Sequence, residues 1–322
     1  MAVPKLYVRD LKANQEITTT FLLQKKETKQ KKNGGQYLML NFGDKTGAMT
    51  AFMWENIGEY VDAVEPGDFV LAKGLVKEYN GHLQLSIYKV KRVEDREVNV
   101  ADYLPSSQND LDAEFDQLID IIRGMRNRHL QALLLRLFGD EELARKFKNC
   151  PAGKTLHHAY IGGLMEHVLS IIQLAQAMKQ HYPALNLDLL VAGAILHDIG
   201  KVDELSYARS FEYTDDGKLI GHLTMEVMLV DRAIHTLPDF PEELRRQLLH
   251  MLVSHHGKYE YGSPKLPMTL EAIVLHYLDN LDAKVYAMQW LTENDDTGSE
   301  NWTGYSKMFD GYVYKKRMKD EG

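Results

Sequence analysis

The chain has 322 residues, of which 44% are hydrophobic and 26% charged, and it carries a net charge of −8 at pH 7. This length suits two globular domains, and no stretch approaches the roughly 18 uninterrupted apolar residues of a membrane span. The N-terminus lacks the apolar core of a secretory signal. A single cysteine, Cys150, excludes an internal disulfide framework and favours a reducing, cytoplasmic location.

Residues 16–93 have the pattern of a small β barrel. Runs rich in β-branched and aromatic residues alternate with turn residues, and Asn80 with Gly81 is a strong hairpin signal. A short helical piece near Tyr60 precedes the fourth run. Five short strands with this helix predict a barrel of the OB type. The expected strands are residues 17–23, 37–42, 48–54, 69–76 and 82–88.

A basic stretch follows the first expected strand and is opposed only by Glu27. Its lysines are Lys25, Lys26, Lys29, Lys31 and Lys32. We expect them on the loop between the first two strands, where they would attract nucleic-acid phosphates despite the negative net charge. On charge alone, a solvated loop is the simpler interpretation.

OB barrels bind single strands with a basic groove and exposed aromatic rings. Tyr37 is the ring we assign to nucleic-acid binding, and Phe42, Phe52 and Trp54 are further candidates. For any single ring, however, alternation along a strand favours the barrel core. Phe52 and Trp54 are two positions apart and share a face, which we expect to be the core face.

A polar, proline-containing stretch separates this barrel from a helical region. We expect a barrel domain over residues 1–95, a linker over 96–111, an all-α domain over 112–300 and a tail over 301–322. Apolar residues at three- and four-residue steps predict the helices. The expected helices begin near residue 111 and continue over residues 130–138, 141–147, 162–178, 187–199, 223–237, 241–255 and 268–291. Residues 212–220 are expected to form an extended loop or hairpin.

Metal-ligating residue types recur at helix ends or on apolar faces of this region. They are His167, His197, Asp198, His222, His255, His256 and Asp279. Each alone has a structural explanation, such as a hydrogen-bonded core histidine or a charge at a helix end. Together they predict a cation, because unpaired polar groups on buried helix faces are costly. Imidazole and carboxylate ligands suit a divalent transition metal.

The order of these residues resembles the HD-domain superfamily of metal-dependent phosphohydrolases over about residues 150–290. The resemblance implies that His167, His197, Asp198 and Asp279 hold one metal. It also implies a second metal, bridged by Asp198 and held by His222, His255 and His256; which of His255 and His256 ligates is left open, with His255 favoured. Two cations would activate water and clamp the attacked phosphate.

The whole chain resembles the YhaM-type 3′–5′ exoribonucleases, which join an OB barrel to an HD domain. The motifs are Gly-Gly-Leu-Met-Glu-His, Leu-His-Asp-Ile-Gly-Lys, Ser-His-His-Gly and Leu-His-Tyr-Leu-Asp-Asn-Leu-Asp-Ala-Lys. The resemblance implies hydrolysis of single-stranded RNA, and of single-stranded DNA as well, with Mn²⁺ favoured over Fe or another transition metal. The alternatives are a phosphohydrolase of nucleotides or cyclic dinucleotides, and a nucleic-acid-binding protein with a structural HD site.

Three residues near this set have open roles. Lys201, three residues after Asp198, either meets developing phosphate charge as a catalytic residue or complements a helix dipole. His157 and His158 could contact substrate phosphate or supply a proton.

The tyrosines and lysines after Asn301 suit a subunit contact in a homo-oligomer. No membrane partner is expected.

Overall fold

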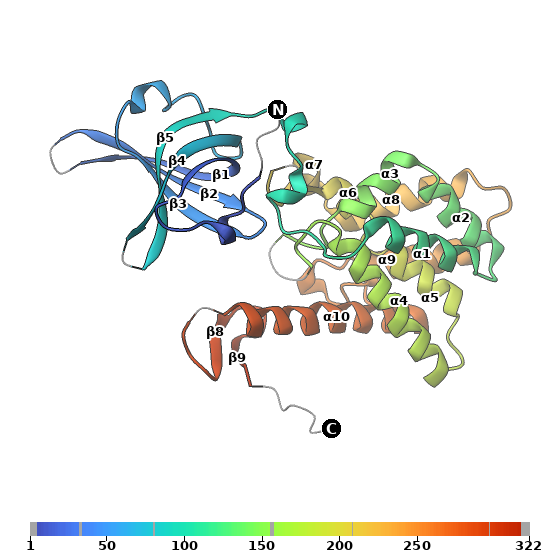
Figure 1. The fold of residues 1–322 in the computed structure, drawn as a ribbon. Helices are drawn as coiled ribbons and strands as arrows, with labels where there is room; N and C mark the ends of the chain where they lie inside the picture. Colours follow the sequence, from blue (N-terminus) through green and yellow to red (C-terminus); the bar gives the residue numbers. More distant parts are fainter. Residues whose placement is uncertain are drawn as a thin grey trace. The chain divides into compact units, whose positions relative to one another are not determined.

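The computed structural model describes residues 5–31, 34–79, 81–154, 158–207, 209–295 and 297–316. It divides into two compact units, which are described separately (Figure 1). The first unit contains residues 1–106 with 206–211, and the second contains residues 107–205 with 212–322. Within the described residues, no helix is long and apolar enough to cross a membrane.

The first unit is a closed five-stranded barrel with the strand order β1-β2-β3-β5-β4. Neighbouring strands are antiparallel except for β3 and β5, which are parallel. The strands are β1 (Glu16–Gln30), β2 (Gln36–Asp44), β3 (Gly47–Met53), β4 (Phe69–Tyr79) and β5 (His82–Arg92), with the 3-10 helix η2 (Ile57–Glu59) before β4. This order confirms the predicted OB-type barrel.

Alternation along the strands fills the barrel with apolar side chains. Phe21, Leu40 and Phe42 are fully buried, and the rings of Phe21 and Phe42 stack with centroids 5.2 Å apart. Beyond the strands, Tyr103 packs on Phe69 and donates a hydrogen bond to Thr20 at 2.5 Å. The polar stretch after β5 therefore packs on the barrel as far as residue 103.

The sequence predicted that the basic stretch lies on a loop, but most of it belongs to a strand. β1 continues to Gln30, and its second half, from Leu22 to Gln30, pairs with β2, so that Lys29 faces Tyr37 across the two strands. Lys25, Lys26 and Lys29 are strand residues. The polar composition indicated a loop, but the ladder of backbone hydrogen bonds with β2 keeps this segment extended.

The second unit is a helical bundle centred on a helix that is apolar after its first turn. The helices are α1 (Leu111–Arg123), α2 (Arg128–Phe138), α3 (Glu141–Asn149), α4 (Gly163–His181), α5 (Leu187–Leu196), α6 (Lys201–Glu204), α7 (Asp215–Leu219), α8 (His222–His235), α9 (Glu242–Ser254) and α10 (Leu270–Asn294). α5 packs against α4, α9 and α10. A Cβ on Gly193 would lie 2.2 Å from the Met251 side chain, so glycine permits the close approach of α9.

The segment predicted as an extended loop or hairpin and the C-terminal tail both contain regular structure. Within residues 212–220, β7 (Glu212–Tyr213) pairs with β6 (Leu205–Ser206), but the rest forms α7, which Thr214 caps by accepting a hydrogen bond from Gly217. Thr214 thus starts a helix where a turn was expected. The tail forms a hairpin of β8 (Trp302–Ser306) and β9 (Gly311–Tyr314).

Candidate metal centre and nucleic-acid interface

Five helices bring the predicted ligands together in the second unit. His197 ends α5 and Asp198 follows it, while His167 lies one turn inside α4 and Asp279 lies on α10. His222 begins α8, and His255 and His256 follow α9. A Cβ on Gly200 would lie 2.3 Å from the His222 carbonyl oxygen, so glycine lets the chain after Asp198 approach the start of α8.

Two groups of ligand atoms form around Asp198. In the first group, His167, His197 and Asp279 present atoms within 4.8 Å of one another. Nε2 of His167 lies 3.3 Å from Asp279 Oδ1, and Nε2 of His197 lies 3.4 Å from Asp198 Oδ2. This group brings together the residues that the HD resemblance assigns to one metal.

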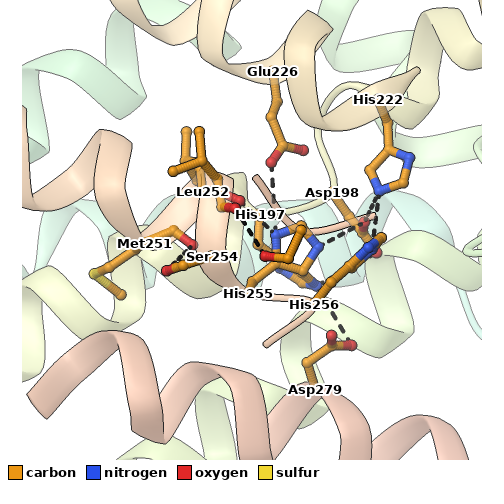
Figure 2. A network of polar contacts seen from close by, with 12 residues as sticks. His197, Asp198, His222, Glu226, Met251, Leu252, Ser254, His255, His256 and Asp279 are labelled. Atoms are coloured by element: carbon orange, nitrogen blue, oxygen red, sulfur yellow. Dashed lines mark hydrogen bonds and ion pairs between the residues drawn. The ribbon is translucent and has the colours of Figure 1, made fainter. Parts of the chain in front are cut away.

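The second group consists of His222, His255 and His256, again within 4.8 Å. Nε2 of His222 and Nε2 of His255 lie 3.7 and 3.8 Å from Asp198 Oδ1, as Figure 2 shows. The two oxygens of Asp198 therefore face different groups, which is the placement that a bridging carboxylate needs. His256 Nε2 lies 3.3 Å from His222 Nε2, so both members of the His-His pair face this group.

All five histidines of the two groups have Nδ1 engaged. His167 donates to Asp282 at 2.7 Å and His222 to Glu204 at 2.8 Å. The other three donate to backbone carbonyls: His197 to Ala194, His255 to Leu252 and His256 to Tyr261. Such bonds hold the tautomer in which Nε2 carries the lone pair. Nε2 of each ring is thus the atom available to a metal.

The centre is costly without a cation. Among the described residues, the buried atoms His197 Nε2 and Asp198 Oδ1 have no hydrogen-bond partner. Buried polar atoms are nearly always satisfied, so such a pair needs an explanation. A divalent cation supplies it, because neutral imidazole and carboxylate together are the ligands of Mn, Fe and Zn sites. The residues present therefore fit the divalent metal that HD domains imply.

The electrostatics of the buried ligands also suit a cation. Burial lowers the pKa of His255 well below its usual value and that of His197 as well, so both rings are neutral. Burial would raise the pKa of Asp198, but Lys201 and the surrounding histidines hold it well below its ordinary value. Burial also acts to lower the pKa of His167, but its bonds to Asp279 and Asp282 raise it to about 9. Metal binding at His167 would therefore release a proton.

Lys201 is buried and contacts Asp198. Its Nζ donates to Asp198 Oδ2 at 2.7 Å and to the Ala152 carbonyl oxygen at 2.6 Å. Burial lowers its pKa, but the charge of Asp198 more than reverses this and the lysine stays protonated. Lys201 also lines a cavity of about 250 Å³ beside the ligands, together with Asp198, His255, His256, Tyr261, His276, Asp279, Asn280 and Ala283.

His158 does not reach this cavity, which contradicts the substrate contact expected of it. Its ring is buried and stacked on Tyr286 with centroids 4.0 Å apart. Nε2 donates to Asp282 at 3.1 Å and Nδ1 lies 2.8 Å from the Tyr160 hydroxyl. Both nitrogens are occupied, so His158 supports Asp282 instead of contacting RNA. His157 lies outside the described residues.

Three carboxylates near the histidines were missed from the sequence. Asp282 accepts hydrogen bonds from His158, His167 and Ser170, and Glu204 accepts from His222. Glu226 is fully buried, with Oε1 3.7 Å from His255 Nδ1. Burial, reinforced by the charge of Asp198, raises the pKa of Glu226 well above its usual value. The available signal was helical spacing: Asp282 is three residues after Asp279, and Glu226 is four after His222.

On the barrel, one outward sheet face combines rings with basic residues. Across β1 and β2, Lys29 pairs with Tyr37 and Lys25 with Asn41; across β2 and β3, Met39 pairs with Phe52. Paired residues point to the same side of a sheet. We call Lys25, Lys29, Tyr37, Phe52 and Trp54 the aromatic–basic face.

The three rings of this face stack on one another. Tyr37 lies 4.6 Å from Trp54, and Phe52 lies 5.5 Å from Trp54, between ring centroids. Trp54 is 45% exposed. The expectation that Phe52 and Trp54 face the core was therefore wrong. Met53, which lies between them, occupies the inward position. Phe42, by contrast, is a core residue.

The lysines of the basic stretch differ in what their side chains contact. Lys25 and Lys29 are exposed and both pair with Glu27. Lys26 donates instead to the carbonyl oxygens of Val61 and Val64 and pairs with Glu65, which ties it to the barrel and contradicts a free phosphate contact. Lys31 donates to the Trp54 carbonyl oxygen at 2.5 Å. Lys32 lies outside the described residues.

Comparison with known proteins agrees with this architecture. Residues 164–284 match the HD domain family, and residues 23–93 match the OB-fold nucleic acid binding domain family. Among solved structures, the second OB-fold domain of replication protein A from Methanococcus maripaludis is 22% identical and covers 28% of this chain and 96% of its own, with a TM-score of 0.24.

Two full-length relatives carry the same name. The 3′-5′ exoribonuclease YhaM of Geobacillus sp. (strain WCH70) is 37% identical over 312 residues, which are 94% of this chain and 95% of the relative. The 3′-5′ exoribonuclease YhaM of Bacillus subtilis (strain 168) is 38% identical over 285 residues, covering 88% and 90%. With both domains matched and the HD ligands gathered around Asp198, this chain belongs to the YhaM family of 3′–5′ exoribonucleases.

Proposed function

We propose that this protein is a metal-dependent 3′–5′ exoribonuclease that hydrolyses single-stranded RNA to nucleoside monophosphates, with single-stranded DNA as a second substrate. The observation that carries the proposal is the division of Asp198 between two groups of histidines, with Oδ2 toward His197 and Oδ1 toward His222 and His255. This is the ligand arrangement of a two-cation phosphodiesterase. The names of the relatives supply the substrate class.

The residues assign roles within this centre. Bound divalent cations would polarise a phosphate oxygen and lower the pKa of water. We assign the first cation to His167, His197, Asp198 and Asp279, and the second to Asp198, His222, His255 and His256. Mn²⁺ is our choice of metal, with Fe or another transition metal as the alternative.

Lys201 is the charged group of the chain closest to the bridging carboxylate. Its bonds to Asp198 and to the Ala152 carbonyl hold the ammonium group at the wall of the cavity. A fixed positive charge there stabilises negative charge that develops on a phosphate. We therefore propose Lys201 as a catalytic residue, in addition to its orientation of Asp198.

The cavity and the barrel face suit an end-directed nuclease. A cavity of about 250 Å³ is small for a ligand site and suits one terminal nucleotide. The aromatic–basic face offers three stacked rings beside Lys25 and Lys29, and bases of any sequence stack on aromatic side chains. We assign residues 1–95 to strand binding and residues 112–300 to hydrolysis.

We also propose that the chain forms a homo-oligomer and acts in the cytoplasm. The hairpin β8–β9 exposes half or more of each of four aromatic side chains, those of Trp302, Tyr305, Tyr312 and Tyr314. Rings of this kind are enriched at subunit contacts. Light scattering should show a lower mass per particle for a chain cut after Glu300; an unchanged mass would discard this contact.

The test of function is a time course on single-stranded RNA labelled at either end, with Mn²⁺. We expect mononucleotide release from the 3′ end, loss of activity in Asp198→Asn, and full activity in Asp120→Asn, which changes an exposed aspartate on α1. Free nucleotides and cyclic dinucleotides are offered in parallel. Intact RNA beside hydrolysed nucleotides would replace the proposal with a small-molecule phosphohydrolase. RNA binding with no hydrolysis would indicate a binding protein.

A further inference from the structure

Glu226 is a polar side chain that the roles assigned above leave unexplained. It is fully buried, and neither of its carboxylate oxygens has a hydrogen-bond partner among the described residues. An unsatisfied buried polar group costs about 1–3 kcal/mol, and more when it is charged. The position on α8 places Glu226 one turn beyond His222, on the same side of the helix. In its ionised form, a buried acid in this setting needs a positive partner.

The carboxylates behind the histidines show where that partner belongs. In the first group, Asp282 accepts the hydrogen bond of His167 Nδ1. In the second group, Glu204 accepts that of His222 Nδ1. Glu226 takes the corresponding position behind His255, but its Oε1 lies 3.7 Å from Nδ1, which is too far for a hydrogen bond (Figure 2). His255 Nδ1 meanwhile donates to Leu252 at 2.8 Å, so this ring has a carbonyl and a carboxylate on the same side.

Counting charges gives the same assignment. The second group consists of three histidines and shares only Asp198 with the first, whereas the first group has Asp279 as its own ligand. With Glu226 included, each group has two carboxylates besides Asp198: Asp279 and Asp282 in the first, Glu204 and Glu226 in the second. When all five carboxylates are ionised in the metal-bound centre, they and the ammonium group of Lys201 amount to a formal charge of −4, which two divalent cations balance.

We propose that Glu226 is the positioning residue of the second cation: its carboxylate, beside Nδ1 of His255, offsets the charge of a cation held by His222, His255 and His256. This inference rests on the proposed two-cation centre. It does not make Glu226 a ligand, because the side chain lies behind His255 and does not line the cavity. A carboxylate behind a ligating histidine typically changes metal affinity 10- to 100-fold, as an order of magnitude.

The test measures Mn²⁺ binding to the full-length, metal-stripped protein. Calorimetry gives the affinities, and elemental analysis after gel filtration gives the number of bound ions. Glu226→Gln keeps the shape of the side chain and removes its charge. We expect the variant to bind the first Mn²⁺ as the parent does and the second about 10- to 100-fold more weakly. Glu226→Asp, which keeps the charge, should recover part of the second affinity. The mirrored variant Asp282→Asn should weaken the first Mn²⁺ instead.

Glu114→Gln is the matched control, since Glu114 is a partly buried acid that also has an unsatisfied Oε2 and lies outside the centre. It should leave both Mn²⁺ affinities unchanged. The metal-free Glu226→Gln protein should melt no lower than the parent. Equal weakening of both sites with a lower melting temperature would reveal a purely structural role and overturn the proposal, as would an unaltered second affinity. A parent protein that binds fewer than two Mn²⁺ would instead refute the two-cation centre itself.

Discussion

The metal centre of the helical unit buries polar side chains, whereas the aromatic–basic face of the barrel exposes apolar ones. His197 and Asp198 are inaccessible to solvent or nearly so, while Trp54 is 45% exposed. Both arrangements oppose the usual partition of residues between core and surface. The proposed function explains each by something the chain would bind: a cation in the first case and the bases of a strand in the second.

The two regions differ in how strongly the fold holds their residues. In the metal centre, each histidine is fixed by an Nδ1 hydrogen bond, and the helices around α5 are closely packed. On the barrel face, the rings contact mainly one another. The centre is thus a preorganised site for chemistry, and the face is a tolerant surface for binding. Perturbing each should change a different observable.

Removing the metal should have the largest effect and should separate the two regions. Chelation with EDTA is expected to lower the rate of RNA hydrolysis on the order of 10³-fold or more, because cations supply several kcal/mol of transition-state stabilisation. Fluorescence anisotropy of labelled RNA should change little, because the aromatic–basic face needs no cation. Added Mn²⁺ should restore the rate. RNA binding lost in parallel with activity would contradict this separation.

Trp54→Ala should have the next largest effect, and it should fall on binding. Loss of one base-stacking contact is worth about 1–3 kcal/mol, which predicts a KM for a long RNA raised roughly 5- to 150-fold with kcat nearly unchanged. A dinucleotide too short to reach the face should be cleaved as before. The control is Tyr88→Ala, which removes an exposed ring that lies on β5, outside the aromatic–basic face. A fall in kcat on the dinucleotide would place Trp54 in the chemistry instead.

Asp282→Asn should alter stability in acid. Burial raises the pKa of Asp282, but hydrogen bonds from His158 and His167 lower it far more, so its folded pKa is below the unfolded value of about 4. Its carboxylate therefore stabilises the folded state above pH 4, and this contribution is lost as the pH falls below 4. Loss of bonds to a charged group should cost about 1.5–3 kcal/mol at pH 7.

Denaturant unfolding of the metal-free protein across pH 2–7 measures this contribution. The parent should lose stability toward acid more steeply than Asp282→Asn. Asp120→Asn, on an exposed surface, should follow the parent curve. Parallel curves for the parent and Asp282→Asn would show that the carboxylate contributes nothing to the pH dependence.

The smallest effect should come from the lysines of the barrel. Replacing Lys25 or Lys29 by Gln should each reduce the slope of log Kd against log salt concentration by about 0.7, which is one phosphate contact on a single strand. Lys26→Gln should leave that slope unchanged and destabilise the barrel, because its ammonium group bonds to Val61, Val64 and Glu65. Equal slopes for all variants would remove the basic residues from the interface.

Much of the molecule follows from the sequence because period and residue type carry strong physical constraints. Alternating β-branched residues with glycine turns predicted the barrel, and three- and four-residue apolar spacing predicted the helices. The seven metal-ligating candidates stood out because histidine and aspartate are costly on apolar helix faces. The structure gathers the other six around Asp198, from helices that are distant in the sequence.

Only the tertiary structure decided which face each residue occupies and what stands behind it. The inward or outward direction of Phe52 and Trp54 depends on strand register, which a shift of one residue would reverse. Lys26 and His158 looked like ligands for phosphate, but both find internal acceptors through folding. Asp282, Glu204 and Glu226 carry no local signal strong enough to identify them, because a carboxylate acquires its role from the histidine that another part of the chain places against it.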